Sequence, residues 1–210
     1  MEANFWHQKW QRGEIGFHRE HANPNLVAHI DQLALAQGNR VFLPLCGKTR
    51  DIAYLLSLGY QVVGAELSEL AIQALFQELS IEPNKTQLAH LTHYHAENID
   101  IFVGDIFKLS PELLGKVDAI YDRAALVALP LTMRLDYCAH LMRLTQNAQQ
   151  LLVTLEYQQE LIAGPPFSIS EQEVHQHYAN TYSINLIARQ NAEGGIKAKV
   201  PADEVVYVLK

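Results

Sequence analysis

Residues 40–68 restrict the fold of this chain more than any other segment. They predict an apolar strand, a glycine turn, a helix and a second apolar strand, at residues 41–45, 46–48, 51–58 and 61–65. The apolar first run is typical of a strand buried on both faces of a parallel sheet. A helix between two such strands is the crossover that parallel pairing requires. This segment therefore predicts an α/β fold.

The second strand leads into a carboxylate, Glu66. A carboxylate about 20 residues after a glycine turn is placed to accept hydrogen bonds from ribose hydroxyls. Taken alone, such a carboxylate more often caps the next helix. Polar residues also follow the next two expected strands, at Gly104-Asp105 and Asp122-Arg123. Because the carboxyl ends of parallel strands meet at one edge of the sheet, the repeated pattern favours a pocket for a nucleoside cofactor.

The rest of the chain continues the alternation of strands and helices. Further strands are expected at residues 99–103, 117–121, 150–156, 182–188 and 205–209. The pattern predicts a Rossmann-like open sheet of seven strands, mostly parallel, with helices on both faces and a terminal hairpin. Residues 81–98 are polar and are expected to form a loop or an insertion.

Size and charge exclude several classes of protein. A chain of 210 residues fits one domain, 1–210. Its net charge of -7 and the lack of a Lys/Arg-rich run argue against nucleic acid as a partner. We also expect no membrane association, since no apolar run approaches the roughly 18 residues that span a bilayer. The two cysteines have no disulfide or metal spacing, which favours a cytoplasmic protein, and no dimerisation helix is evident, so a monomer is expected.

Residues 1–25 are rich in aromatic and histidine side chains, including Trp6, Trp10, Phe17 and His18. Two interpretations stay open. The segment either forms a lid over the pocket, or it is a helix that docks on the core through its aromatic rings.

The glycine turn lacks the known phosphate-binding motifs. A P-loop needs a glycine five residues before Gly47, where Phe42 stands inside a strand, and the dinucleotide fingerprint G-x-G-x-x-G is absent. A cofactor without phosphates, which binds through adenosine and an amino-acid group, needs fewer close backbone contacts. S-adenosylmethionine fits this description.

Several strings carry a specific resemblance across nearly the whole chain. They are FWHQKWQRGEIGFH at residues 5–18, PLCGK at 44–48, GAELS at 64–68, GDIF at 104–107, YDRAALVALP at 121–130 and GPPF at 164–167. In this order they resemble the thiopurine S-methyltransferase family, in particular its bacterial branch. The resemblance implies a class I methyltransferase fold, the cofactor S-adenosyl-L-methionine with S-adenosyl-L-homocysteine as its product, and a small thiol as the acceptor.

The resemblance also implies roles for individual residues. Those expected to contact the cofactor are Trp10, Leu45, Glu66, Asp105, Ile106 and Arg123, with Glu66 on the ribose diol. Those expected to line the acceptor pocket are Phe17, His18, Pro165 and Phe167, because a flat aromatic ring needs apolar and aromatic walls.

Arg123 is the candidate for a catalytic aid. Its guanidinium would bind the methionine carboxylate of the cofactor or stabilise an anionic acceptor. The alternative is a structural ion pair with Asp122 or Glu156.

Two other features are expected to be structural. His90, His93 and His95, with Glu97, carry ligand types that suit zinc, but packing or surface histidines are favoured and no metal is expected. Cys46 lies in the turn without an evident base nearby and is expected to pack.

The sequence thus indicates methyl transfer to the sulfur of aromatic or heterocyclic thiols. The alternatives are methylation of selenium or tellurium species, methylation of a small nitrogen or oxygen nucleophile, and a non-catalytic nucleoside-binding protein. The acceptor itself is not specified.

Overall fold

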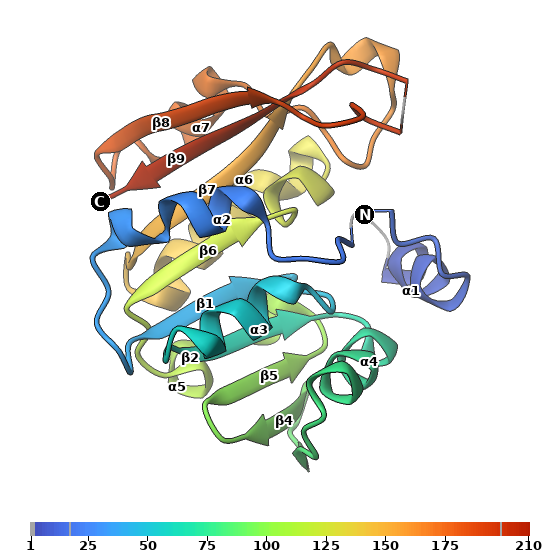
Figure 1. Ribbon diagram of the computed structural model, residues 1–210, viewed down its shortest axis with the longest axis vertical. Helices are drawn as coiled ribbons and strands as arrows, with labels where there is room; N and C mark the ends of the chain where they lie inside the picture. The colour runs from blue at the N-terminus through green and yellow to red at the C-terminus, as the bar shows by residue number, and fades with distance from the viewer. Residues whose placement is uncertain (1–2, 17, 198) are drawn as a thin grey trace.

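One nine-stranded sheet runs through the computed structural model, which describes residues 3–16, 18–197 and 199–210 (Figure 1). The strand order is β3-β4-β5-β2-β1-β6-β7-β9-β8. Five central strands are parallel, namely β5 (Ile99–Val103), β2 (Gln61–Glu66), β1 (Arg40–Pro44), β6 (Ala119–Arg123) and β7 (Gln149–Glu156). The chain leaves β1 toward β2 and later returns to β6 on its other side, so the strand order reverses between β1 and β6.

The outer strands are antiparallel. They are β3 (Asn84–Gln87) and β4 (Thr92–Ala96) at one edge, and β9 (Asp203–Leu209) and β8 (Ile184–Asn191) at the other. The predicted α/β fold and terminal hairpin are confirmed, but the prediction of seven strands is wrong. Residues 81–98 contribute the two additional strands. Every residue of β3 is exposed, because an edge hairpin needs little apolar surface, and the polar sequence therefore resembled a loop.

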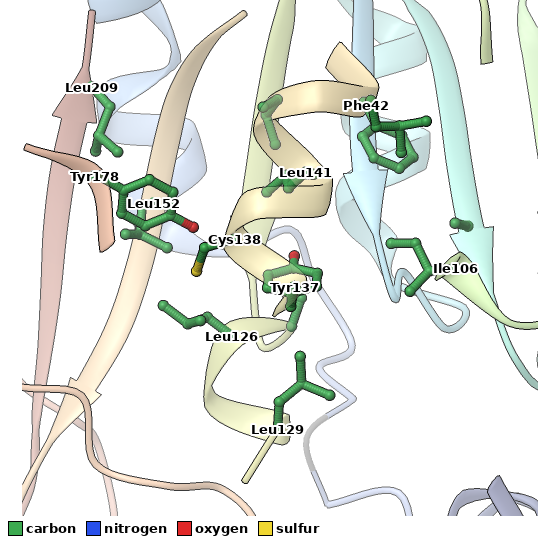
Figure 2. Close-up of a cluster of buried hydrophobic side chains, with 14 of the residues drawn as sticks. Phe42, Ile106, Leu126, Leu129, Tyr137, Cys138, Leu141, Leu152, Tyr178 and Leu209 are labelled. Carbon is green, nitrogen blue, oxygen red and sulfur yellow. The ribbon is translucent and has the colours of Figure 1, made fainter. Parts of the chain in front are cut away.

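Helices cover both faces of the sheet (Figure 1). One face packs against α2 (Pro24–His29), α3 (Arg50–Ser57) and α4 (Glu69–Leu79), and the other against α5 (Pro111–Leu114), α6 (Leu131–Thr145) and α7 (Glu171–Tyr178). Short 3-10 turns complete the chain at Ile30–Leu33, Ile106–Lys108, Leu126–Ala128 and Gln159–Leu161. In Figure 2, Tyr137, Cys138 and Leu141 of α6 lie among buried apolar side chains that include Leu152 of β7.

Local hydrogen bonds explain where two helices begin. The hydroxyl of Thr49 accepts a bond from the amide of Asp51 at the start of α3, and the hydroxyl of Ser170 accepts one from the amide of Glu173 at the start of α7. At the start of α4 the side chain of Ser68 makes no capping bond. Its backbone amide donates to Glu66 instead, at 2.8 Å.

The N-terminal helix α1 (Ala3–Gln11) lies beyond the ends of the central strands (Figure 1). It contacts α4, and none of its residues is buried. Further along the chain, the guanidinium of Arg19 bonds Glu204 of β9 at 2.6 Å, and the backbone amide of Asn23 donates to the buried carboxylate of Asp51 at 2.6 Å. The lid role of residues 1–25 stays a prediction. In the part of the chain that the structure describes, no helix is long and apolar enough to cross a membrane.

Candidate active site

The ends of four neighbouring strands gather the residues predicted to bind a cofactor. Glu66 and Arg123 are the last residues of β2 and β6, and Leu45 follows β1 directly. Asp105 and Ile106 follow β5. Because β5, β2, β1 and β6 are consecutive in the sheet and parallel, these five residues lie along one edge, at the reversal of strand order where such sheets bind ligands.

Glu66 is fixed by backbone hydrogen bonds. One carboxylate oxygen accepts from the amide of Gly47 and the other from the amide of Ser68, each at 2.8 Å. The side chain is buried, with 6% exposure. Burial raises the pKa of Glu66, and the amide bonds oppose that shift. Each carboxylate oxygen has two lone pairs, so these two amide bonds leave acceptor capacity for hydroxyl groups of a ligand.

The turn between β1 and α3 has a constrained backbone. Leu45 and Gly47 have φ values of 49° and 53°, in the left-handed region. The Cys46 side chain between them packs against Gly64, where an added Cβ would lie 2.9 Å from the Cys46 sulfur. Burial, and then the charge of Glu66, raise the pKa of the Cys46 thiol well above its usual value. The thiol is therefore protonated at neutral pH, which agrees with the predicted packing role.

The end of β5 presents one exposed and one buried residue. The Asp105 carboxylate is exposed and caps the short turn after β5 by accepting from the amide of Phe107 at 3.0 Å. Ile106 is buried in the core, and its carbonyl oxygen lies 2.9 Å from Nε2 of His140. Gly104 before them has a φ of 139° and donates its amide to the carbonyl of Glu66 at 2.8 Å, which ties the ends of β5 and β2 together.

The two carboxylates considered as ion-pair partners of Arg123 have other partners. Asp122 is fully buried and accepts from the Tyr137 hydroxyl at 2.7 Å and from the Leu126 amide at 3.2 Å. Glu156 pairs with Arg189 at 2.8 Å. Arg123 itself is half-buried at the end of β6.

The loop with Pro165 and Phe167 reaches the β6 side of this edge. The amide of Phe167 donates to the carbonyl of Val127 at 2.6 Å, four residues beyond Arg123. The guanidinium of Arg134 lies over the Phe167 ring, 5.7 Å from its centre. Residues from the loop after β7 are thereby held next to the end of β6.

The N-terminal segment supplies His18 to the same region. Burial lowers the pKa of His18, the positive charges of Lys48, Arg50 and Arg123 lower it further, and the Glu78 carboxylate opposes this shift. Trp10 lies on α1 and is partly exposed. Phe17, the other predicted acceptor contact from this segment, falls outside the described residues.

Sequence reasoning missed a charged cluster beside His18. The ammonium of Lys48 lies 2.6 Å from one carboxylate oxygen of Glu78, and Arg50 lies 3.4 Å from the other. The sequence feature that pointed to this cluster was Lys48, the last residue of the PLCGK string, for which no role was predicted. Two cations facing one carboxylate leave this cluster with one net positive charge.

The donor set fits a nucleoside with a free diol better than a phosphate. Glu66 is an acceptor for hydroxyl groups, and the Gly47 amide of the turn is already bonded to it. A phosphate site would instead need several backbone amides directed at the ligand.

Comparison with known proteins identifies the family. Residues 1–209 match the thiopurine S-methyltransferase family. The chain belongs to this family. It is 50% identical over 211 residues to a thiopurine S-methyltransferase of Xanthobacter autotrophicus, covering 100% of this chain and 99% of the relative. A thiopurine S-methyltransferase of Teredinibacter turnerae is also 50% identical, over 209 residues, covering 100% of this chain and 97% of the relative. The predicted family is thus confirmed, and the protein is an S-adenosylmethionine-dependent methyltransferase.

Solved structures agree on the fold. A 1,6-didemethyltoxoflavin-N1-methyltransferase of Burkholderia thailandensis, with S-adenosylhomocysteine bound, superposes with a TM-score of 0.67 at 15% identity, covering 99% of this chain and 87% of the other. A magnesium protoporphyrin IX methyltransferase of Synechocystis, also with S-adenosylhomocysteine bound, gives 0.58 at 15% identity, covering 88% and 80%. Identities this low support the Rossmann-like methyltransferase fold alone.

Proposed function

We propose that this protein transfers the methyl group of S-adenosylmethionine to the sulfur of an aromatic or heterocyclic thiol. The observation that carries this proposal is the match to the thiopurine S-methyltransferase family over residues 1–209. The arrangement of polar residues at the strand ends is compatible with it.

On the cofactor side, Glu66 accepts hydrogen bonds from the ribose hydroxyls, and the Leu45 turn packs against the nucleoside. Asp105 and Ile106 at the end of β5 border the adenine. Trp10 covers the site from α1, where its ring face can favour the cationic sulfonium. The support for Glu66 is geometric, since two amide bonds hold the carboxylate before any ligand binds.

On the acceptor side, His18, Pro165 and Phe167 form the walls. The hydrogen bond from Phe167 to Val127 supports this assignment because it holds the GPPF loop against the segment that follows Arg123. Arg123 stands between the two halves of the site and stabilises the carboxylate of the cofactor or the thiolate of the acceptor.

Bound S-adenosylmethionine supplies a methyl group on a positively charged sulfur. The protein's own task is to hold the acceptor sulfur in line with that methyl group, since positioning accounts for much of the acceleration of such transfers. The attacking species is the thiolate. Heterocyclic thiols ionise readily, so a dedicated base is unnecessary. The positive charges of Arg123 and Lys48 favour the ionised acceptor.

We also infer the wider organisation. Residues 1–210 act as one domain in which residues 1–25 form the lid, and the protein works as a monomer in the cytoplasm. The free, buried thiols of Cys46 and Cys138 support a reducing compartment.

An acceptor panel tests the function. Wild-type protein is incubated with S-adenosylmethionine and 6-mercaptopurine, a selenol, tellurite, or a small amine or phenol, and S-adenosylhomocysteine is measured. We expect turnover with the thiol. Turnover confined to selenium or tellurium species, or to the nitrogen and oxygen nucleophiles, would replace the proposed acceptor. Cofactor binding without turnover on any acceptor would favour a binding protein.

A further inference from the structure

We propose that His93, His95 and Asp100 form a binding site for a divalent transition metal such as Zn²⁺. The three side chains stand apart from the candidate active site. In the described part of the chain, each of the three offers one possible metal-ligand atom, and these three atoms all lie within 4.8 Å of one another.

Strand register places the three ligands on one face of the sheet. His93 and His95 are two residues apart on β4, so their side chains point to the same side. His95 pairs with Asp100 of the antiparallel strand β5, and directly paired residues also share a face. A His-x-His pair on one strand and a carboxylate across from it form a chelate whose spacing is set by the backbone.

The observed distances are close to those of a metal site. Nε2 of His93 and Nδ1 of His95 lie 2.8 and 2.9 Å from the same oxygen of Asp100. Zinc bonds of about 2.0–2.2 Å in a tetrahedral site separate ligand atoms by roughly 3.3 Å. Moving Asp100 about half an ångström away from the imidazoles, and drawing the two imidazole nitrogens, which lie at most 4.8 Å apart, to a similar spacing, would admit the ion with water as a fourth ligand.

Neighbouring side chains orient the ligands. The His93 ring stacks on Phe102, with ring centres 4.6 Å apart and planes inclined by 10°. Arg40 bonds the other oxygen of Asp100 at 2.9 Å and also bonds the carbonyl of Leu114. Hydrogen bonds of this kind to a ligating carboxylate are usual around metals. The positive charge of Arg40 also weakens cation binding, so we expect moderate rather than very tight affinity.

Solvent access and ligand type both favour a borderline transition-metal ion. His95 is 56% exposed, while His93 and Asp100 are 25% and 24% exposed, so an ion can enter from solvent. Two imidazoles and one carboxylate suit zinc, copper or nickel rather than magnesium or calcium, which prefer oxygen ligands.

The proposal revises the expectation from the sequence, which placed His90 and Glu97 with these histidines and favoured packing or surface roles. The structure replaces those two residues with Asp100, which is close only because β4 and β5 pair. A bound ion would link β4 to β5 and so stabilise the exposed edge of the sheet.

Titration of the full-length protein with ZnCl₂ after treatment with a chelator tests the proposal. We expect one saturable site per chain, with affinity reduced roughly tenfold or more in His93→Gln and in His95→Gln. His95 is exposed, so its variant should retain the wild-type circular dichroism spectrum. His175→Gln, at an exposed position on α7, is the matched control and should bind like wild type.

Cobalt supplies a second readout. Co²⁺ should give visible absorption of a tetrahedral complex in wild type and in His175→Gln, and not in His95→Gln. The proposal is overturned by the absence of saturable binding to folded wild-type protein, or by equal affinity in wild type and both cluster variants.

Discussion

Glu66 accepts a hydrogen bond from the amide of Gly47 at 2.8 Å, although the two residues are 19 positions apart in the chain. The bond joins the ends of β1 and β2, and the Ser68 amide holds the second oxygen of the same carboxylate. Glu66 is therefore oriented by the fold before it meets a ligand. Binding then costs less conformational entropy in this side chain.

The close packing of Gly64 on the turn predicts a stability effect. A Cβ at position 64 would lie 2.7 Å from Ile101 and 2.9 Å from the Cys46 sulfur. We expect Gly64→Ala to lower the free energy of unfolding by about 1–3 kcal/mol, as overpacked cores do. Urea denaturation measures the change. Gly16→Ala is the control, because an added Cβ there meets nothing within 4 Å. Equal stability of Gly64→Ala and wild type would contradict the packing argument.

Asp122 predicts a specific dependence of stability on pH. Burial raises its pKa to about 6, against the hydrogen bonds from Tyr137 and Leu126. The folded state thus holds the proton more tightly than the unfolded chain. The resulting stabilisation is complete below the unfolded pKa near 3.8 and is lost as pH rises through about 6. Between pH 5 and pH 8 this loss amounts to about 1 kcal/mol.

Asp122→Asn removes this titration while an amide can keep both hydrogen bonds, since the Tyr137 hydroxyl can accept as well as donate. The variant should therefore gain stability relative to wild type from pH 5 to pH 8, as measured by urea denaturation at both values. Asp136→Asn, at an exposed position on α6, should show no such gain. A stability difference from wild type that is the same at both pH values would refute the raised pKa.

Tryptophan fluorescence can report on the lid alone. The chain has two tryptophans, Trp6 and Trp10, and both lie on α1. If α1 covers the bound cofactor, adding S-adenosylhomocysteine should shift their emission to shorter wavelength, because at least one indole leaves water. Trp6→Phe and Trp10→Phe should show which ring responds, and we expect Trp10. An emission spectrum that stays constant while binding is detected calorimetrically would exclude a lid role for α1.

Replacing Arg123 should slow methyl transfer. We expect Arg123→Met to lower kcat/KM for a heterocyclic thiol by roughly 100-fold, the scale seen when a group that stabilises reacting charge is removed. Arg123→Lys should retain part of the rate because it keeps the charge. Lys116→Met also removes one positive charge, from a side chain 88% exposed, and serves as the control. Similar kcat/KM for Arg123→Met and wild type would assign Arg123 to the scaffold.

The central fold was predictable because its signals are local. The buried strands β1 and β2 are apolar runs, and the turn and helix between them have recognisable start and stop residues. The carboxyl ends of these strands then had to meet, so Gly47, Glu66, Asp105 and Arg123 could be grouped from the sequence. The edge strand β3 gave no apolar pattern, because water rather than the core covers it, and β4 beside it has Tyr94 as its one buried side chain.

Long-range side-chain pairings were beyond prediction. Asp100 joins His93 and His95 only through the register of β4 and β5, and Glu78 meets Lys48 only because α4 packs beside the turn. Asp122 had been considered as an ion-pair partner of Arg123. Its carboxylate instead accepts a hydrogen bond from the hydroxyl of Tyr137, 15 positions later on α6.

The affinity of S-adenosylhomocysteine for wild type and Glu66→Gln, measured by calorimetric titration, tests the proposed cofactor site most directly. Glutamine keeps the shape but removes the charge and one acceptor. We predict binding to wild type that is weaker in the variant by about 1–3 kcal/mol, with Glu160→Gln, at an exposed carboxylate, unchanged. Equal affinity of wild type and a correctly folded Glu66→Gln protein would contradict the assignment of Glu66 to the ribose, and no binding to wild type would contradict the cofactor site as a whole.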